Sequence, residues 1–102
     1  MSEIINDGTH TVIKPGVDVV AAMAERFKGD MLTAINASQC GVALDLQGVE
    51  KIDAIGVGMI IAAYNTLNQK GRELKIVNAT KDIFELFSTM GLNRRIMLEC
   101  SK

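Results

Sequence analysis

The stretch that decides the fold spans residues 41 to 58 and reads GVALDLQGVEKIDAIGVG. It begins with a short apolar run, Gly41 to Leu46, of the kind that forms a strand buried on both faces of a parallel sheet. A polar loop follows, and helical spacing predicts a helix from Gly56 to Lys70. Asp53 stands three residues before Gly56, where a carboxylate can cap the free N–H groups of a helix start. The stretch therefore predicts a strand, a loop and a helix in an α/β domain.

Upstream of this stretch, the sequence predicts a hairpin and then a helix. Two β-prone runs, Ser2 to Asn6 and Thr9 to Lys14, flank the dipeptide Asp7-Gly8, which favours a tight hairpin turn. Helical spacing then extends from Val19 to Ser38. The apolar face expected of that helix consists of Ala24, Phe27, Met31, Ala34 and Ile35.

Downstream, strands and helices continue to alternate. Gly71 fits a helix end, and Leu74 to Val77 follows as a strand. Thr80 is a candidate N-cap for a third helix, which Gly91 would end, and Met97 to Cys100 is a candidate final strand. Strands that alternate with helices favour parallel pairing. We therefore expect a mixed sheet with an N-terminal hairpin and helices packed against it, as one domain over residues 1–102.

The composition excludes several classes of function. The 102 residues carry a net charge of −1, which argues against a nucleic-acid-binding protein with a basic surface. Two cysteines and one histidine are too few soft ligands for a tetrahedral zinc site, and we expect no metal and no cofactor. The longest apolar run, Ile55 to Tyr64, is ten residues long and cannot span a bilayer. The start of the chain has no signal-peptide pattern, so we expect a cytoplasmic protein without direct membrane insertion.

The ordered motifs resemble those of the STAS domain family, which comprises the anti-sigma factor antagonists and their relatives. The resemblance rests first on Leu44-Asp45-Leu46, Val49 and residues 52–58. Residues 71–77 and 86–92 are similar to the same family in spacing and type, so the resemblance covers nearly the whole chain. It implies a bacterial protein-interaction domain of signal transduction and transcription regulation, not an enzyme.

The resemblance also implies a partner and a switch. Signalling members of the family bind an anti-sigma factor serine kinase and so release a sigma factor. The kinase phosphorylates a serine or threonine after the aspartate at the helix start, and the added negative charge breaks the complex. In this sequence Ala54 follows Asp53 and Ile55 comes next, and neither side chain can accept a phosphate. We therefore expect that the domain is not phosphorylated at the usual site.

The helix after Asp53 supplies the expected docking surface. At 100° per residue, Gly58, Met59 and Ala62 fall on the flank or outside the core face. The core face itself is expected to consist of Val57, Ile60, Ala63, Tyr64 and Leu67. The residues expected to bind the partner are Asp53, Ala54, Ile55, Gly56, Gly58 and Met59.

Three hypotheses on the role of the domain remain open at this point. It can be a permanently unphosphorylated antagonist, a scaffold in a larger assembly, or a STAS accessory subunit of a membrane transport complex. An enzyme is disfavoured because no nucleophile, base or metal set converges in the sequence. The pair Gly56 and Gly58 does not make a dinucleotide-binding loop, because Ile61 stands where the third glycine is required.

Overall fold

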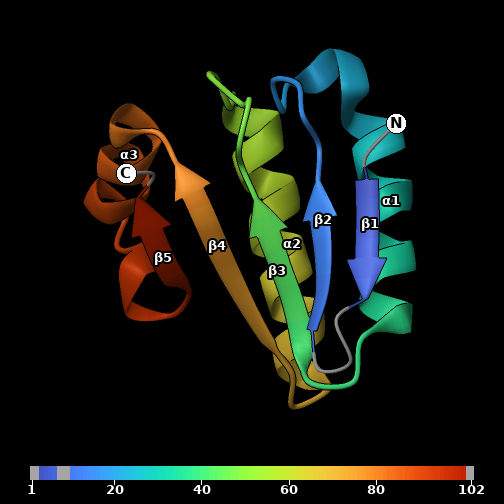
Figure 1. The fold of residues 1–102 in the computed structure, drawn as a ribbon. Coiled ribbons are helices and arrows are strands. Elements are labelled where there is room, and N and C mark those ends of the chain that lie inside the picture. Colours follow the sequence, from blue (N-terminus) through green and yellow to red (C-terminus); the bar gives the residue numbers. More distant parts are fainter. Residues whose placement is uncertain (1–2, 7–9, 101–102) are drawn as a thin grey trace.

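The chain forms one mixed sheet in which the order of the strands follows their order in the sequence (Figure 1). The computed structural model describes residues 3–6 and 10–100. The first two strands pair antiparallel, and every later neighbour is parallel. The strands are β1 (Glu3–Asn6), β2 (His10–Lys14), β3 (Gly41–Asp45), β4 (Glu73–Ala79) and β5 (Met97–Cys100).

Helices connect the parallel strands. They are α1 (Ala24–Ala37), α2 (Ala54–Gln69) and α3 (Lys81–Thr89), and short 3-10 turns lie at Ala21–Met23 and Leu92–Arg94. Figure 1 shows α1 and α2 side by side behind the sheet, with α3 beside β5. None of the helices in the described ranges is long and apolar enough to cross a membrane. The expected α/β class with a mixed sheet is confirmed.

The core lies between the sheet and its helices. The predicted apolar stripe of α1 is confirmed, because Phe27 and Met31 are buried, as are Ala34 and Ile35, while Ala24 is half-buried. On α2 the predicted core residues are also buried, except that Tyr64 is half-buried against the core. Burial of one large apolar side chain contributes about 1.5–3 kcal/mol, so these two stripes fix both helices on the sheet.

The predicted hairpin is confirmed by its strands. β1 pairs with β2 from Glu3 opposite Lys14 to Asn6 opposite Thr11. The predicted turn at Asp7-Gly8 lies outside the described residues.

Two predicted helix starts were wrong. The first helix does not begin at Val19, because that residue forms a β-bridge with Ile52, and α1 starts only at Ala24. The second helix starts at Ala54, two residues before the predicted Gly56. The first shift follows from the pairing of Val19 with the loop before α2, which the periodicity of the segment does not show. The second follows from capping geometry, because Asp53 is itself the N-cap and its carboxylate bonds to the N–H of the third helical residue, Gly56.

β3 is buried along its whole length, as predicted, although no helix in the described ranges covers one of its faces (Figure 1). Val42 and Leu44 belong to the core under the helices. Ala43 and Asp45 alternate with them and are only 4% and 6% exposed. At Asp45, contacts with Lys14 of β2 and Asn78 of β4 contribute to this burial.

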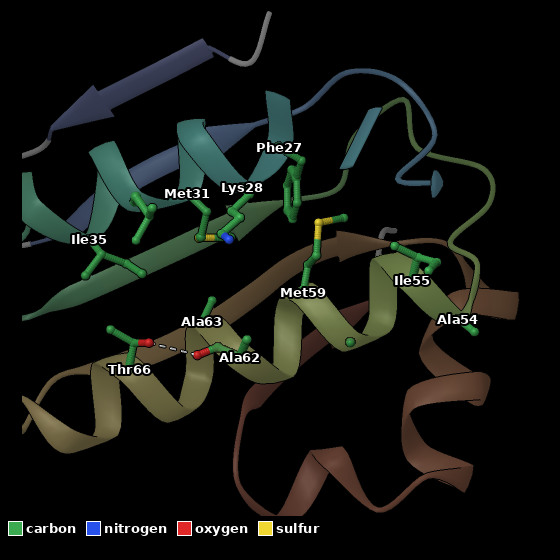
Figure 2. Close-up of a pocket in the computed structure, with 12 residues that line it drawn as sticks. Phe27, Lys28, Met31, Ile35, Ala54, Ile55, Met59, Ala62, Ala63 and Thr66 are labelled. Carbon is green, nitrogen blue, oxygen red and sulfur yellow. Dashed lines mark hydrogen bonds between the residues drawn. The ribbon is translucent and has the colours of Figure 1, made fainter. Parts of the chain in front are cut away.

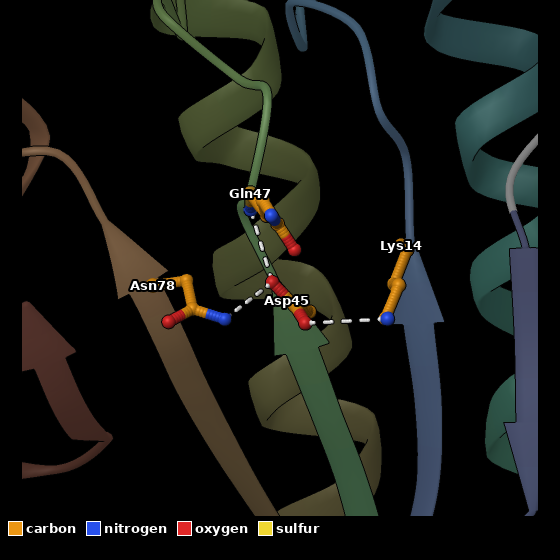
Figure 3. Close-up of polar contacts among 4 residues, drawn as sticks. All are labelled: Lys14, Asp45, Gln47 and Asn78. Carbon is orange, nitrogen blue, oxygen red and sulfur yellow. Dashed lines mark hydrogen bonds and ion pairs between the residues drawn. The ribbon is translucent and has the colours of Figure 1, made fainter. Parts of the chain in front are cut away.

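The carboxyl end of β3 carries a polar network that joins three strands (Figure 3). Asp45 Oδ1 accepts hydrogen bonds from the Gln47 backbone N–H and from Asn78 Nδ2, each at 3.0 Å. Asp45 Oδ2 lies 3.9 Å from Lys14 Nζ on β2. Asn78 adopts a left-handed conformation with φ of 58°, at the irregularity in the pairing of β4 with β5. The network aligns the ends of β2, β3 and β4, beside the loops that form the site.

Candidate protein-interaction site

The loops that follow β2 and β3 are joined to each other at the carboxyl edge of the sheet. The Val19 N–H donates to the Lys51 carbonyl at 3.0 Å, and the Asp53 N–H donates to the Val19 carbonyl at 3.3 Å. Asp18 Oδ1 accepts from the N–H groups of Glu50 and Lys51 at 2.9 and 3.0 Å. These bonds hold the two loops as one unit at the start of α2.

Asp53 caps α2, as its position predicted, and also bonds to the other loop. Its Oδ1 accepts from the Gly56 N–H and its Oδ2 accepts from the Ala21 N–H, both at 2.8 Å. The hydrogen bonds from Gly56 and then Ala21 hold the pKa of Asp53 below its ordinary value of 3.8, against a smaller opposing effect of desolvation. The chain's own carboxylate thus meets the positive end of the helix.

Gly56 shapes the site from inside. A Cβ at this position would lie 2.2 Å from the Val19 carbonyl oxygen and 2.9 Å from Ile52 Cγ2. Only a glycine therefore lets the first turn of α2 lie against the other loop. Gly56 is buried, so the prediction that it contributes to the contact surface has to be corrected. It positions that surface and does not form it.

The other residues predicted to bind the partner differ in how far they are exposed to solvent. Ala54 and Gly58 are exposed, and 52% of Ile55 is exposed. Met59 was expected away from the core, but it is half-buried and packs against the core. In Figure 2 its side chain extends from α2 toward Phe27 of α1. The helical wheel misplaced Met59 because it included no neighbouring helix.

An apolar groove of about 510 Å³ lies between α1 and α2 (Figure 2). Four predicted site residues, Ala54, Ile55, Gly58 and Met59, contribute to its α2 wall. The complete lining is Phe27, Lys28, Met31, Leu32, Ile35, Ala54, Ile55, Gly58, Met59, Ala62, Ala63 and Thr66. The groove thus continues the predicted docking surface onto α1.

Sequence reasoning missed the contributions of the first loop and of α1. Asp18 and Val19 belong to the site because β2 and β3 are parallel, so that the loops after them meet at one edge. That rule could have found Asp18, a polar residue soon after a predicted strand. The α1 wall could not have been found in this way, because its position depends on the packing of the two helices.

Among the described residues, neither a metal-ligand cluster nor a disulfide is found. No group of three or more His, Cys, Asp or Glu side chains among residues 3–6 and 10–100 is placed to hold a metal ion. Cys40 and Cys100 are exposed and unpaired by disulfide. At the carboxyl edge, two hydrogen-bonded loops therefore lie next to an exposed apolar side chain, Ile55, in the first turn of α2.

Comparison with known proteins agrees with the motifs and the fold. The family model of the STAS domain matches residues 2–101. The chain belongs to the STAS domain family. A curated relative, the anti-sigma F factor antagonist of Paenibacillus polymyxa, is 32% identical over 70 residues. That match covers 68% of this chain and 60% of the relative, so it spans less than two thirds of the relative's length.

Solved structures share the STAS fold with this chain. An anti-sigma-factor antagonist domain protein from Planctomyces limnophilus has a TM-score of 0.83 at 16% identity, over 99% of this chain and 91% of that chain. A sulfate transporter family protein from Wolinella succinogenes has a TM-score of 0.72 at 17% identity, over 93% and 80%. At such identities these similarities establish the fold, and the function has to be argued from the site.

Proposed function

We propose that this STAS domain is a non-enzymatic, anti-sigma factor antagonist-like regulator of bacterial signalling, which binds an anti-sigma factor serine kinase or a related regulator in the cytoplasm. The observation that supports this proposal most strongly is the exposure of Ile55, a large apolar side chain that is 52% exposed in the first turn of α2. Two joined loops and the Asp53 cap hold this turn in place. An exposed apolar side chain on a rigid element is the kind of group that anchors a protein–protein interface.

The partner would contact the exposed residues around Ile55. Ala54 and Gly58 flank it on α2, and Met59 forms the half-buried floor beside it. Asp53 lies just before them and caps the helix. The interface would then be a small apolar centre at the carboxyl edge of the sheet.

The proposal includes a binding surface that stays unphosphorylated. Ala54 is the first residue of α2. By the resemblance of the motif, we assign it to the position at which switchable family members carry a serine or threonine. A phosphate there would add about −1.5 to −2 charges next to the Asp53 carboxylate. With a methyl group instead, a kinase could not disrupt the complex through this position.

Binding to a purified anti-sigma factor kinase from the same bacterium, measured by titration calorimetry, tests the interface. Ile55→Asp is expected to weaken binding at least about tenfold, because the charge loses its hydration when the partner packs on it. Leu86→Asp on α3 is the matched control, since Leu86 is 41% exposed and does not line the groove. Equal losses in the two variants would contradict the proposed interface.

The expectation about phosphorylation has its own test. Incubation with the kinase and ATP should leave the wild-type mass unchanged, whereas Ala54→Ser should gain one phosphate and then bind more weakly. The variant should fold normally, because Ala54 is exposed at a helix start where serine is tolerated. Stoichiometric phosphate on the wild-type protein would refute the proposal of a constitutive binding state.

A second candidate function is that of an accessory subunit in a membrane transport complex. It is favoured only by the likeness in fold to the sulfate transporter family protein of Wolinella succinogenes. The two candidates predict different gene neighbours: a kinase or phosphatase gene for the regulator, and permease and ATPase genes for the transport subunit. Specific binding to the neighbouring ATPase, and none to a kinase, would decide for the transport role.

A further inference from the structure

We propose that the groove between α1 and α2 binds a small amphiphile, namely a free long-chain carboxylate. This inference goes beyond the proposed function, because it concerns a ligand that purified protein can bind without any partner. It depends on the shape of the groove, on the chemistry of its walls and on one cation at its rim.

The groove has the dimensions of a ligand site. Its volume of about 510 Å³ lies within the roughly 300–1,000 Å³ that is usual for small-molecule pockets. Its lining on α2 extends from Ala54 to Thr66, which corresponds to about 18 Å along the helix axis. Such a length suits an extended acyl chain lying between the two helices.

The walls are almost entirely apolar, and part of their apolar surface faces water. Leu32 on α1 is 46% exposed and Ile55 on α2 is 52% exposed, and both line the groove. Thr66 is polar, but its hydroxyl already donates to the Ala62 carbonyl at 3.0 Å. A hydrocarbon chain would cover this surface without leaving a polar group of the groove unpaired.

Lys28 is the only ionisable side chain in the lining. Figure 2 shows its amino group in the space between the helices. In the part of the chain that the structure describes, the ion pairs involve other residues and no carboxylate lines the groove. One cation beside an apolar groove complements an amphiphile with a single negative head.

The groove is open because the facing side of α2 carries small residues. Ala54, Gly58 and Ala62 follow one another at intervals of four residues along the lining. A Cβ built on Gly58 meets no atom within 4 Å, so the space beside it is free. A larger side chain at Gly58 would therefore project into the groove and occupy the place of the ligand.

The probe is myristate, titrated into purified protein by calorimetry below its micelle concentration. We expect saturable binding of one molecule per chain. Tetradecyltrimethylammonium, which has the same chain length and the opposite charge, should bind at least about tenfold more weakly. Equal binding of the two amphiphiles, or no saturable binding of myristate, would overturn the proposal. Stronger association with phosphatidylglycerol vesicles than with free myristate would also overturn it, in favour of a membrane surface.

Variants locate the site. Gly58→Leu should reduce myristate affinity at least about tenfold by filling the groove, while thermal melting confirms that the variant is folded. Lys28→Glu should give a similar loss, and Lys81→Glu on α3 is its control, with the same change of charge outside the groove. Equal affinities of Lys28→Glu and Lys81→Glu would refute the role of Lys28 even if Gly58→Leu did not fold. The myristate titration contains no kinase, so a failure to bind myristate does not contradict the proposed function. Equally, a failure to bind the kinase does not contradict the binding of myristate.

Discussion

Gly56 and Gly58 lie in the same turn of α2 but have opposite surroundings. At Gly56 the space for a side chain is filled by the Val19 carbonyl and by Ile52, and at Gly58 it is empty. Alanine ordinarily stabilises a helix relative to glycine, because it restricts the unfolded chain. The same substitution should therefore have opposite effects on the free energy of unfolding at the two positions.

Gly56→Ala is expected to lower the free energy of unfolding by roughly 1–3 kcal/mol, because the new methyl group must displace backbone. Gly58→Ala should raise it by about 0.5–1 kcal/mol, through helix propensity alone. Urea denaturation of both variants measures these changes. A stabilised Gly56→Ala variant would show that the first turn of α2 does not lie against Val19.

Among the helices α1, α2 and α3, α2 is the one whose N-cap side chain is a carboxylate. Asp53 places one carboxylate oxygen on α2 and the other on the segment before α1. Because these bonds lower the pKa of Asp53 in the folded protein, the stabilisation is fully present above the unfolded value of 3.8. It is lost as the pH falls below that value through the folded pKa.

The variant Asp53→Asn should melt at a lower temperature than the wild type at pH 7, because one amide oxygen replaces two accepting carboxylate oxygens. The difference in melting temperature should narrow at a second pH chosen below 3.8, where the wild-type carboxylate becomes protonated as the pH falls through its lowered folded pKa. Melting curves at the two pH values test this. A difference of equal size at both would mean that the charge of Asp53 contributes nothing to the cap.

The elements also show how far the sequence alone could lead. Capping chemistry found the third helix correctly: Thr80 accepts from the Ile83 N–H at 3.3 Å, and Gly91 is left-handed at φ of 78°. Both signals are local, so sequence spacing suffices. Two features depend on contacts between distant segments: the bridge of Val19 to Ile52, and the packing of Met59 against the core. Neither contact can be read from a helical wheel of α2.

At the scale of the whole molecule, β3 is the centre of the sheet. It is hydrogen-bonded to β2 on one side and β4 on the other, and all of its residues are buried. β5 lies at an edge of the sheet, and three of its four residues are exposed. Local opening of a structure is easiest at such edges, because few buried contacts oppose it.

Native-state hydrogen exchange should therefore rank the strands. Backbone amides within β3 are expected to exchange only through global unfolding, with protection equal to the free energy of unfolding measured by urea. Amides of β5 should exchange faster, through openings that leave β3 closed. If β5 proved as protected as β3, the domain would open as one unit and the edge would have no independent motion.

A sheet whose strands follow the order of the chain also affects how the protein is made. Each new strand after β2 can pair with the edge of a sheet that is already outside the ribosome, because no strand has to insert between two existing neighbours. The helix that precedes each new strand can pack on the sheet as synthesis proceeds. Every parallel pairing joins strands that are consecutive in the chain, which keeps the loop-closure entropy of each step low. The nascent chain can thus assemble strand by strand while its later residues are still being translated.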